Sequence, residues 1–329
     1  MKNFLSLFLI LALLTFSCET QFSDDEISTL EDVSLVPHGK EGHVCLTMEA
    51  LDRNLQANPQ LAENMKRIED FTADFIKRGN GRLVNGVIEI PVVYHVIYRT
   101  ASENLPLSQL QDQIDILNED FNLQNPERGS IPAEFAAIEA NVGIRFVLEQ
   151  VIRVQSNKRS WNIGGKDFDA MKFTSSGGSD VVNPQEFLNV WIVNNMPYRG
   201  GTVLGYAQFP GGDWATDGIV LGSRFVGYSG NGFTGRTATH EVGHWLNLRH
   251  IWGDDGSGCT GSDFVDDTPN QGGSYSGQCP PYPSVSCGSN DNTQNYMGYV
   301  DDTCMSMFTQ GQKTRMDAVF AGFRATMAD

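Results

Sequence analysis

Three of the six histidines of this chain fall within eleven residues, in the segment HEVGHWLNLRH at residues 240–250. On a helix, His240 and His244 are one turn apart, so both imidazoles project from one face and can bind one metal ion. His250 adds a third nitrogen, which leaves a fourth tetrahedral position open, as in catalytic zinc sites. Glu241 lies beside that position, where a carboxylate can take a proton from water and deliver it to a leaving group. The segment therefore predicts a helix, then a turn, around one catalytic zinc ion.

The third histidine requires the helix to end between His244 and His250, because six further helical residues would carry it well around the cylinder. In the pattern H-E-x-x-H-x-x-G-x-x-H a glycine supplies left-handed backbone for this turn. Here the position is Asn247, and asparagine is the best tolerated non-glycine residue at positive φ. The alternative is a chance H-E-x-x-H on a surface helix, which the spacing of the third histidine disfavours.

Length and charge exclude several classes of protein. The 329 residues are 40% hydrophobic and 19% charged, enough for the core of one large or two smaller domains, so a disordered or fibrous chain is excluded. The formal net charge of −17 would repel phosphate backbones, so we expect no nucleic-acid partner.

The N-terminus is typical of an exported protein. Residues 1–18 place Lys2 before an apolar run that ends at Phe16, a signal peptide rather than a membrane span, and no other stretch approaches ~18 apolar residues. Cys18 follows the run as in a bacterial lipobox, so we expect it to be lipidated, with ordinary cleavage nearby as the alternative. Contact with a membrane is expected only through this anchor.

Two segments precede the main domain. An acidic tether runs to about His43, and residues 49–79 show helical spacing that Asn58 and Pro59 interrupt. The basic, glycine-rich residues 77–82 are typical of an exposed linker. Strand and helix patterns then alternate: we expect strands in residues 87–98, 144–154, 187–194, 205–210 and 218–223, and helices from about 105, 236 and 309.

Several motifs together resemble a known family. The segment at residues 240–250, with the later NYMGY around Met297, is similar to the metzincin metallopeptidases. The segments LNVWIVN, LGYAQFP, HIWGD, VDDTPNQ and YVDDTCMSMFTQGQ resemble the pappalysin family, in particular its bacterial ulilysin-like and cytophagalysin-like members. The resemblance covers about residues 45–325.

This resemblance implies an α+β metzincin fold of two subdomains, with a twisted, mainly parallel sheet, an active-site helix and a C-terminal helix. A short helical prosegment would precede it: residues 19–83 would form the tether and inhibitory prosegment, and residues 84–329 the catalytic domain. Within that domain, residues 84–250 would form the upper and 251–329 the lower subdomain. Substrate would bind along the edge strand at residues 205–209.

The resemblance also assigns roles at the site. His240, His244 and His250 would be the zinc ligands, Glu241 the general base and acid, and Met297 the Met-turn residue. Tyr299 would point its hydroxyl at the developing oxyanion, with a merely buried aromatic as the alternative. Asp302 would lie at the base of the pocket for the residue after the cut bond and select Arg or Lys there; alternatively, Asp301 and Asp302 only cap a turn.

The cysteines fit an exported precursor. Five remain after Cys18, an odd number, and the four late ones allow three pairings. The resemblance implies bonds between Cys259 and Cys287 and between Cys279 and Cys304. Cys45 resembles the prosegment cysteine whose thiolate takes the fourth zinc position in the latent form, although Leu46 stands where relatives commonly have glycine. A free or adventitiously paired Cys45 is the alternative.

The run SDFVDDTPN at residues 262–270 resembles the family's calcium loop. Its expected ligands are Asp263, Asp266, Asp267 and Thr268, with solvated turn carboxylates as the alternative.

These features predict a monomeric zinc endopeptidase that is made as a latent zymogen. It would cut proteins or peptides at the bond before an Arg or Lys residue. It would be a cell-envelope lipoprotein or would be secreted after prosegment removal. Two rivals remain: a zinc hydrolase of small amides, and a lipid-anchored binding module with a decayed zinc site.

Overall fold

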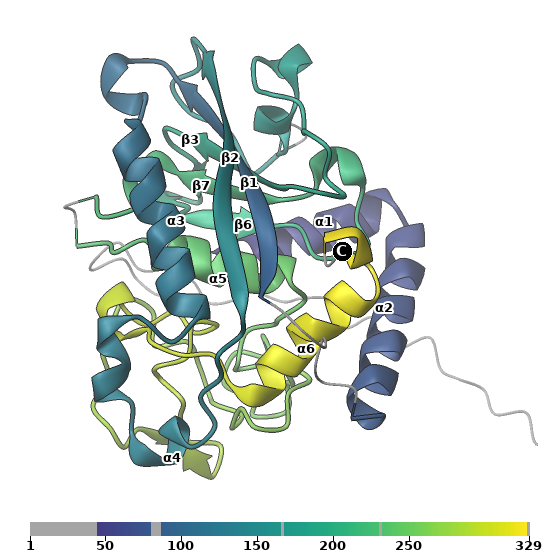
Figure 1. The fold of residues 1–329 in the computed structure, drawn as a ribbon, viewed down its shortest axis with the longest axis vertical. Coiled ribbons are helices and arrows are strands. Elements are labelled where there is room, and N and C mark those ends of the chain that lie inside the picture. The colour runs from purple at the N-terminus through teal and green to yellow at the C-terminus, as the bar shows by residue number, and fades with distance from the viewer. Residues whose placement is uncertain (1–44, 80–86, 166–167, 230–231, 328–329) are drawn as a thin grey trace, which may run out of the picture. The chain divides into compact units, whose positions relative to one another are not determined.

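The computed structural model describes residues 45–79, 87–165, 168–229 and 232–327 (Figure 1). The described residues all belong to the larger of the two units into which the chain divides. The predicted signal peptide, Cys18, the tether and residues 80–86 of the predicted linker lie outside the described residues. Within the described residues, none of the helices combines the length and the apolar run that a membrane span needs.

The larger unit is built on a five-stranded sheet in the order β2-β1-β3-β7-β6 (Figure 1). Strands β1 (Ile88–Tyr98), β2 (Ile144–Gln155), β3 (Leu188–Val193) and β7 (Ile219–Gly222) are parallel, and β6 (Gly205–Ala207) pairs antiparallel with β7. In register, Val92 of β1 lies opposite Leu188 of β3, and Val190 of β3 opposite Ile219 of β7. The near-continuous apolar run of β1 fits a strand that is covered on both faces. The predicted α+β fold with a mainly parallel sheet is confirmed.

Two hydrophobic cores lie on opposite faces of the sheet, since successive strand residues point to opposite sides. Val190 packs into one core with side chains of α3 (Leu107–Phe121) and α5 (Arg236–Trp245). Its neighbour Trp191 packs into the other core, with side chains of residues 161–171 and of α1 (Thr47–Ala57). Helix α5 packs beside β6 and β7, at one edge of the sheet. This arrangement places the predicted metal ligands, which are buried, beside the edge strand of the sheet.

Two disulfides hold the loop-rich part that follows α5. Cys259 is bonded to Cys287 and Cys279 to Cys304, with Cα–Cα distances of 5.4 and 5.8 Å. Both predicted pairings are confirmed. The short elements outside the sheet are α4 (Ala133–Ala136), β4 (Pro197–Tyr198), β5 (Gly201–Thr202), β8 (Val285–Ser286) and β9 (Ser289–Asn290).

The last long helix is α6 (Gln310–Ala321), which begins with a capping box between Thr309 and Gln312. It ends earlier than the predicted helix, because the chain turns at Gly322 before a short 3-10 helix at Ala325–Met327.

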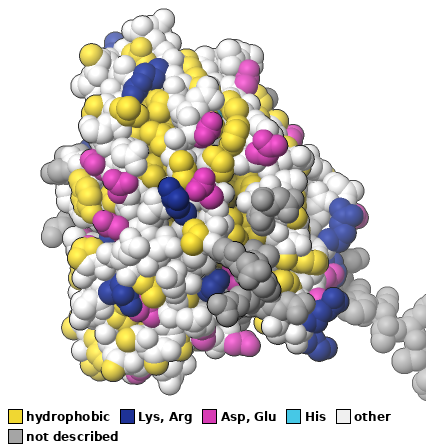
Figure 2. Space-filling view, viewed as in Figure 1, with side chains coloured by type: hydrophobic (Ala, Val, Ile, Leu, Met, Phe, Trp, Pro, Cys, Tyr) yellow, Lys and Arg dark blue, Asp and Glu magenta, His cyan; other side chains and the backbone are white. Residues whose placement is uncertain are grey.

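The N-terminal helices α1 and α2 (Gln60–Lys77) lie on this body. They are separated at Asn58 and Pro59, as the sequence predicts. Helix α1 contacts β6 and α2 lies beside α6 (Figure 1). On the face drawn in Figure 2, Lys and Arg side chains are scattered among acidic and uncharged ones.

Candidate metal centre

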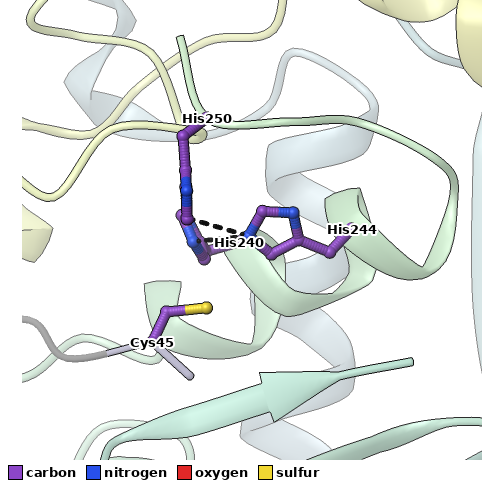
Figure 3. A group of neighbouring side chains, drawn as sticks. All are labelled: Cys45, His240, His244 and His250. Atoms are coloured by element: carbon purple, nitrogen blue, oxygen red, sulfur yellow. Dashed lines mark hydrogen bonds between the residues drawn. The ribbon is translucent and has the colours of Figure 1, made fainter. Parts of the chain in front are cut away.

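Helix α5 and the turn after it bring the three predicted ligands together. Asn247 has φ +69°, so the asparagine adopts the left-handed conformation predicted for the turn. The Nε2 atom of His244 lies 3.1 Å from Nε2 of both His240 and His250 (Figure 3). Ligand nitrogens around a tetrahedral zinc ion are separated by about 3.3 Å, given Zn–N distances near 2.0 Å. The three imidazoles therefore converge on a point that fits one zinc ion.

Each imidazole is oriented through its other nitrogen. Nδ1 of His240 lies 2.7 Å from the Tyr296 carbonyl, and Nδ1 of His244 lies 2.8 Å from the Leu248 carbonyl. Nδ1 of His250 lies 2.6 Å from Oδ1 of Asp254. These acceptors favour the tautomer with hydrogen on Nδ1, which leaves each Nε2 lone pair for a metal. Sequence reasoning missed Asp254, although its spacing of four residues from the third histidine could have indicated it.

Cys45 provides a fourth ligand atom at the same point. Its sulfur and one nitrogen of each histidine all lie within 4.8 Å of one another, and all four residues are buried (Figure 3). The backbone holds the cysteine there, because Cys45 forms a parallel bridge to Gly205 and Leu46 N donates to the Gly205 carbonyl at 3.2 Å. Burial, followed by the nearby Glu241, raises the pKa of this thiol. Three nitrogens and one sulfur are a common ligand set for zinc.

Glu241 is fully buried and held from the same N-terminal segment. Its Oε2 accepts from the Thr47 hydroxyl at 2.9 Å and from the Cys45 thiol at 3.5 Å. Burial raises the pKa of Glu241 to about 8, although both hydrogen bonds lower it. A Cβ atom at Gly205 would lie 3.0 Å from Cγ of Glu241, so β6 approaches the carboxylate closely. Sequence reasoning missed Thr47, whose partner is 194 residues away and leaves no local signal.

Met297 and Tyr299 lie below and beside the histidines. A Cβ atom at Gly243 would clash with the Met297 sulfur, so the methionine packs directly against α5. The Tyr299 ring centroid is 5.5 Å from that of His240 and 4.8 Å from that of His250, and its hydroxyl donates to the Cys45 carbonyl at 3.3 Å. The structure thus brings both residues to the site, while their assigned roles stay predictions.

Asp302 lies at the N-terminal end of α5 and is 1% exposed. Its Oδ2 accepts from the backbone N–H of Thr234 at 2.8 Å and of Arg236 at 3.1 Å. Asp301 caps its own turn by accepting from Thr303 N. Both aspartates therefore accept hydrogen bonds from backbone N–H groups, as the alternative of a turn-capping role expects. Selection of Arg or Lys by Asp302 stays a prediction.

The predicted calcium ligands contact protein donors. Asp263 accepts from the Thr268 hydroxyl at 2.5 Å, and Asp267 accepts from Thr309 and from Gly311 N at the start of α6. Asp266 is exposed. Among the described residues, the group of His, Cys, Asp or Glu side chains placed to hold an ion consists of Cys45 and the three histidines of the site. Calcium binding by Asp263 and its neighbours therefore stays a prediction.

Comparisons with known proteins agree with this geometry. A family model described as pregnancy-associated plasma protein-A, of the Peptidase_M43 family, matches residues 176–321. Extracellular metalloprotease 1 of Coccidioides posadasii is 34% identical over 251 residues, which span 72% of this chain and 79% of that protein. An extracellular metalloprotease of Pyricularia oryzae is 33% identical over 264 residues, 75% of this chain and 80% of the relative. This chain belongs to the pappalysin family.

Solved structures extend the match for this pappalysin to its N-terminal helices. Mature mirolysin of Tannerella forsythia, in complex with a cleaved peptide, is 38% identical, with a TM-score of 0.69, and covers 74% of this chain and 96% of its own. A mutant of Tannerella forsythia promirolysin is 36% identical, with a TM-score of 0.73, and covers 87% of this chain and 96% of its own. The wider match to the precursor agrees with a metzincin fold that carries a prosegment.

The predicted family and enzyme class are therefore confirmed: this pappalysin is a metalloprotease. Family membership implies a catalytic zinc ion, and the converging imidazoles of His240, His244 and His250 fit one. Peptide or protein substrates follow from the enzyme class.

Proposed function

We propose that this pappalysin is made as a latent zinc endopeptidase whose prosegment, within residues 19–83, blocks the site through Cys45. The observation that supports this most directly is the placement of the Cys45 sulfur among the ligand nitrogens of His240, His244 and His250. Because the thiol fills the fourth ligand position, water would be excluded until the segment leaves. Thr47 would block the site in a second way, because its hydroxyl donates a hydrogen bond to Oε2 of Glu241 and so competes with water for that oxygen.

Removal of the segment would free the groups that act on the substrate. Zinc held by the three histidines would polarise the scissile carbonyl and lower the pKa of water. Glu241, no longer bonded to Thr47, takes a proton from the attacking water at Oε2 and delivers it to the leaving nitrogen. The Tyr299 hydroxyl, no longer bonded to the Cys45 carbonyl, donates to the oxygen that gains negative charge.

The substrate would lie along β6, in the place of the Cys45 segment, with Arg or Lys after the cut bond. Two arguments support this: Leu46 already pairs with Gly205 of β6, and the Asp302 carboxylate lies at the N-terminal end of α5, the helix that also carries Glu241. Export is supported by the names of the extracellular relatives. Lipidation of Cys18, calcium binding at residues 263–268 and a monomeric state complete the proposal.

The test is incubation of the purified full chain, alongside Glu241→Ala, with peptides that contain Arg or Lys. Mass spectrometry identifies both the peptide products and any new N-terminus within residues 77–86. We expect the wild type alone to cut before Arg or Lys. Turnover of short amides without turnover of proteins would support the small-amide rival instead, and inert wild type after trypsin treatment would contradict the proposal.

A further inference from the structure

Two arginines next to the metal site share one carboxylate from α2. Arg315 of α6 forms a two-pronged ion pair with Glu69, in which Nη1 and Nη2 each lie 2.7 Å from a carboxylate oxygen. Arg315 is 1% exposed. Burial raises the pKa of Glu69, but the Arg315 ion pair and the charge of Arg249 together bring it below its ordinary value. Glu69 therefore forms an ion pair with Arg315 and lies close enough to Arg249 to feel its charge.

The two guanidinium groups are gathered around one aromatic ring. That of Arg249 lies 5.2 Å and that of Arg315 5.5 Å from the Phe264 ring centroid. Arg249 also lies 5.5 Å from the Phe209 centroid, and its buried Nε has no hydrogen-bond partner among the described residues. Such a site, with two planar cations over apolar walls, suits a carboxylate on an aliphatic stem.

This site borders the substrate cleft. A cavity of about 310 Å³ separates α2 from Pro210, Asn247 and Arg249. Pro210 continues the chain of β6, and Arg249 directly precedes the ligand His250. Phe209, which contacts Arg249, also lies 5.4 Å from the ring of His244. The arginines thus lie just past the C-terminal end of α5, whereas Asp302 lies at its N-terminal end.

We propose that, once α1 and α2 have left, Arg249 and Arg315 bind an acidic side chain of the substrate, N-terminal to the cut bond. This inference rests on the proposed function, because it assumes that α2 is removed and that Asp302 receives the residue after the bond. Departure of Glu69 breaks the ion pair of Arg315 and removes the nearby negative charge that acts on Arg249, and a substrate glutamate can take its place. The ten residues of α5 span about 15 Å, and an extended chain advances about 3.3 Å per residue, so the acidic residue lies about three to five positions before the bond.

The test compares matched peptides on the processed enzyme. The full chain is treated with trypsin to cut the linker, and trypsin is inhibited. The nicked N-terminal segment is then removed by size-exclusion chromatography below about pH 5, where the Glu69 ion pair is weakened, and the enzyme is returned to neutral pH. The peptides have one Arg after the cut bond and carry either Glu or Gln at one of the preceding positions. We expect kcat/KM to be about three- to tenfold higher for Glu than for Gln at three to five positions before the bond, and the gain to shrink in high salt. Arg249→Gln removes the gain, whereas Arg145→Gln, on an exposed arginine of β2, keeps it.

Each outcome decides a different claim. Equal cleavage of Glu and Gln peptides by the wild type overturns the arginine site and leaves the proposed function standing. Cleavage of neither peptide overturns both. If Arg249→Gln folds poorly, a synthetic peptide of residues 60–77 tests the same site on the wild-type enzyme. This peptide should inhibit cleavage of the Glu peptide competitively. Its Glu69→Gln version should inhibit at least threefold less. Equal inhibition by the two versions overturns the inference.

Discussion

Asp120 of α3 accepts a hydrogen bond from the hydroxyl of Tyr296 at 2.8 Å, and the carbonyl of that same tyrosine lies 2.7 Å from Nδ1 of His240. The second carboxylate oxygen of Asp120 accepts from Thr239, the residue before this histidine, at 2.6 Å. One buried carboxylate therefore positions the chain on both sides of a proposed zinc ligand.

Replacement of Asp120 by Asn should weaken zinc retention by about tenfold, because groups that orient ligands commonly contribute on this scale. Competition with a chromogenic chelator measures the affinity directly. Asp115→Asn, on an exposed residue of the same helix, is the matched control and should bind zinc as the wild type does. Equal affinity in both variants would show that Asp120 serves only the fold.

Replacement of Cys45 by Ala should produce a precursor that cleaves peptides before its linker is cut. The sulfur that lies among the three imidazoles is then lost, and water can reach the fourth ligand position. Activity of the uncut chain, checked for integrity by mass spectrometry, is the readout. The double variant with Glu241→Ala should stay inert, and a latent Cys45→Ala precursor would argue against the thiol block.

Acid should loosen the hold of α2 on the body. The Glu69 pKa is lowered in the folded protein, so the ion pair with Arg315 contributes fully above the ordinary carboxyl pKa and is lost as pH falls through the lowered value. Retention of the nicked N-terminal segment, followed by size-exclusion chromatography, should be constant from pH 7 to about pH 5 and fall below that range. Glu69→Gln should retain less segment and show a flatter profile, and identical profiles would contradict the argument.

Loss of either disulfide should destabilise the loops after α5. The bonds close segments of 28 and 25 residues, for which chain entropy gives about 3.5 kcal/mol each. We expect Cys279→Ser with Cys304→Ser to lower the free energy of unfolding by about this amount, measured by urea titration. Cys259→Ser with Cys287→Ser, which removes the other bond, should lower it by a similar amount, and unchanged unfolding in both variants would contradict the argument.

Local sequence patterns predicted much of this molecule. Apolar runs located the strands, and the spacing of His240, His244 and His250, with an asparagine able to adopt positive φ, located the site. Contacts between distant segments were not predictable in this way. Glu69 and Arg315 are 246 residues apart, and Asp120 and Tyr296 are 176 apart, so no periodicity within either segment indicates the partner. Such pairs are set by how the helices dock on the sheet.

The partners of the imidazoles bear on how this enzyme can change over evolutionary time. Two of the three Nδ1 atoms face main-chain carbonyls, of Tyr296 and Leu248, and only His250 depends on a side chain, Asp254. A main-chain acceptor survives any substitution that preserves the backbone path. Point mutations in the surrounding side chains therefore leave the orientation of His240 and His244 largely unchanged. The residues that line the substrate site can change and bind new substrates, while the metal-binding geometry is retained.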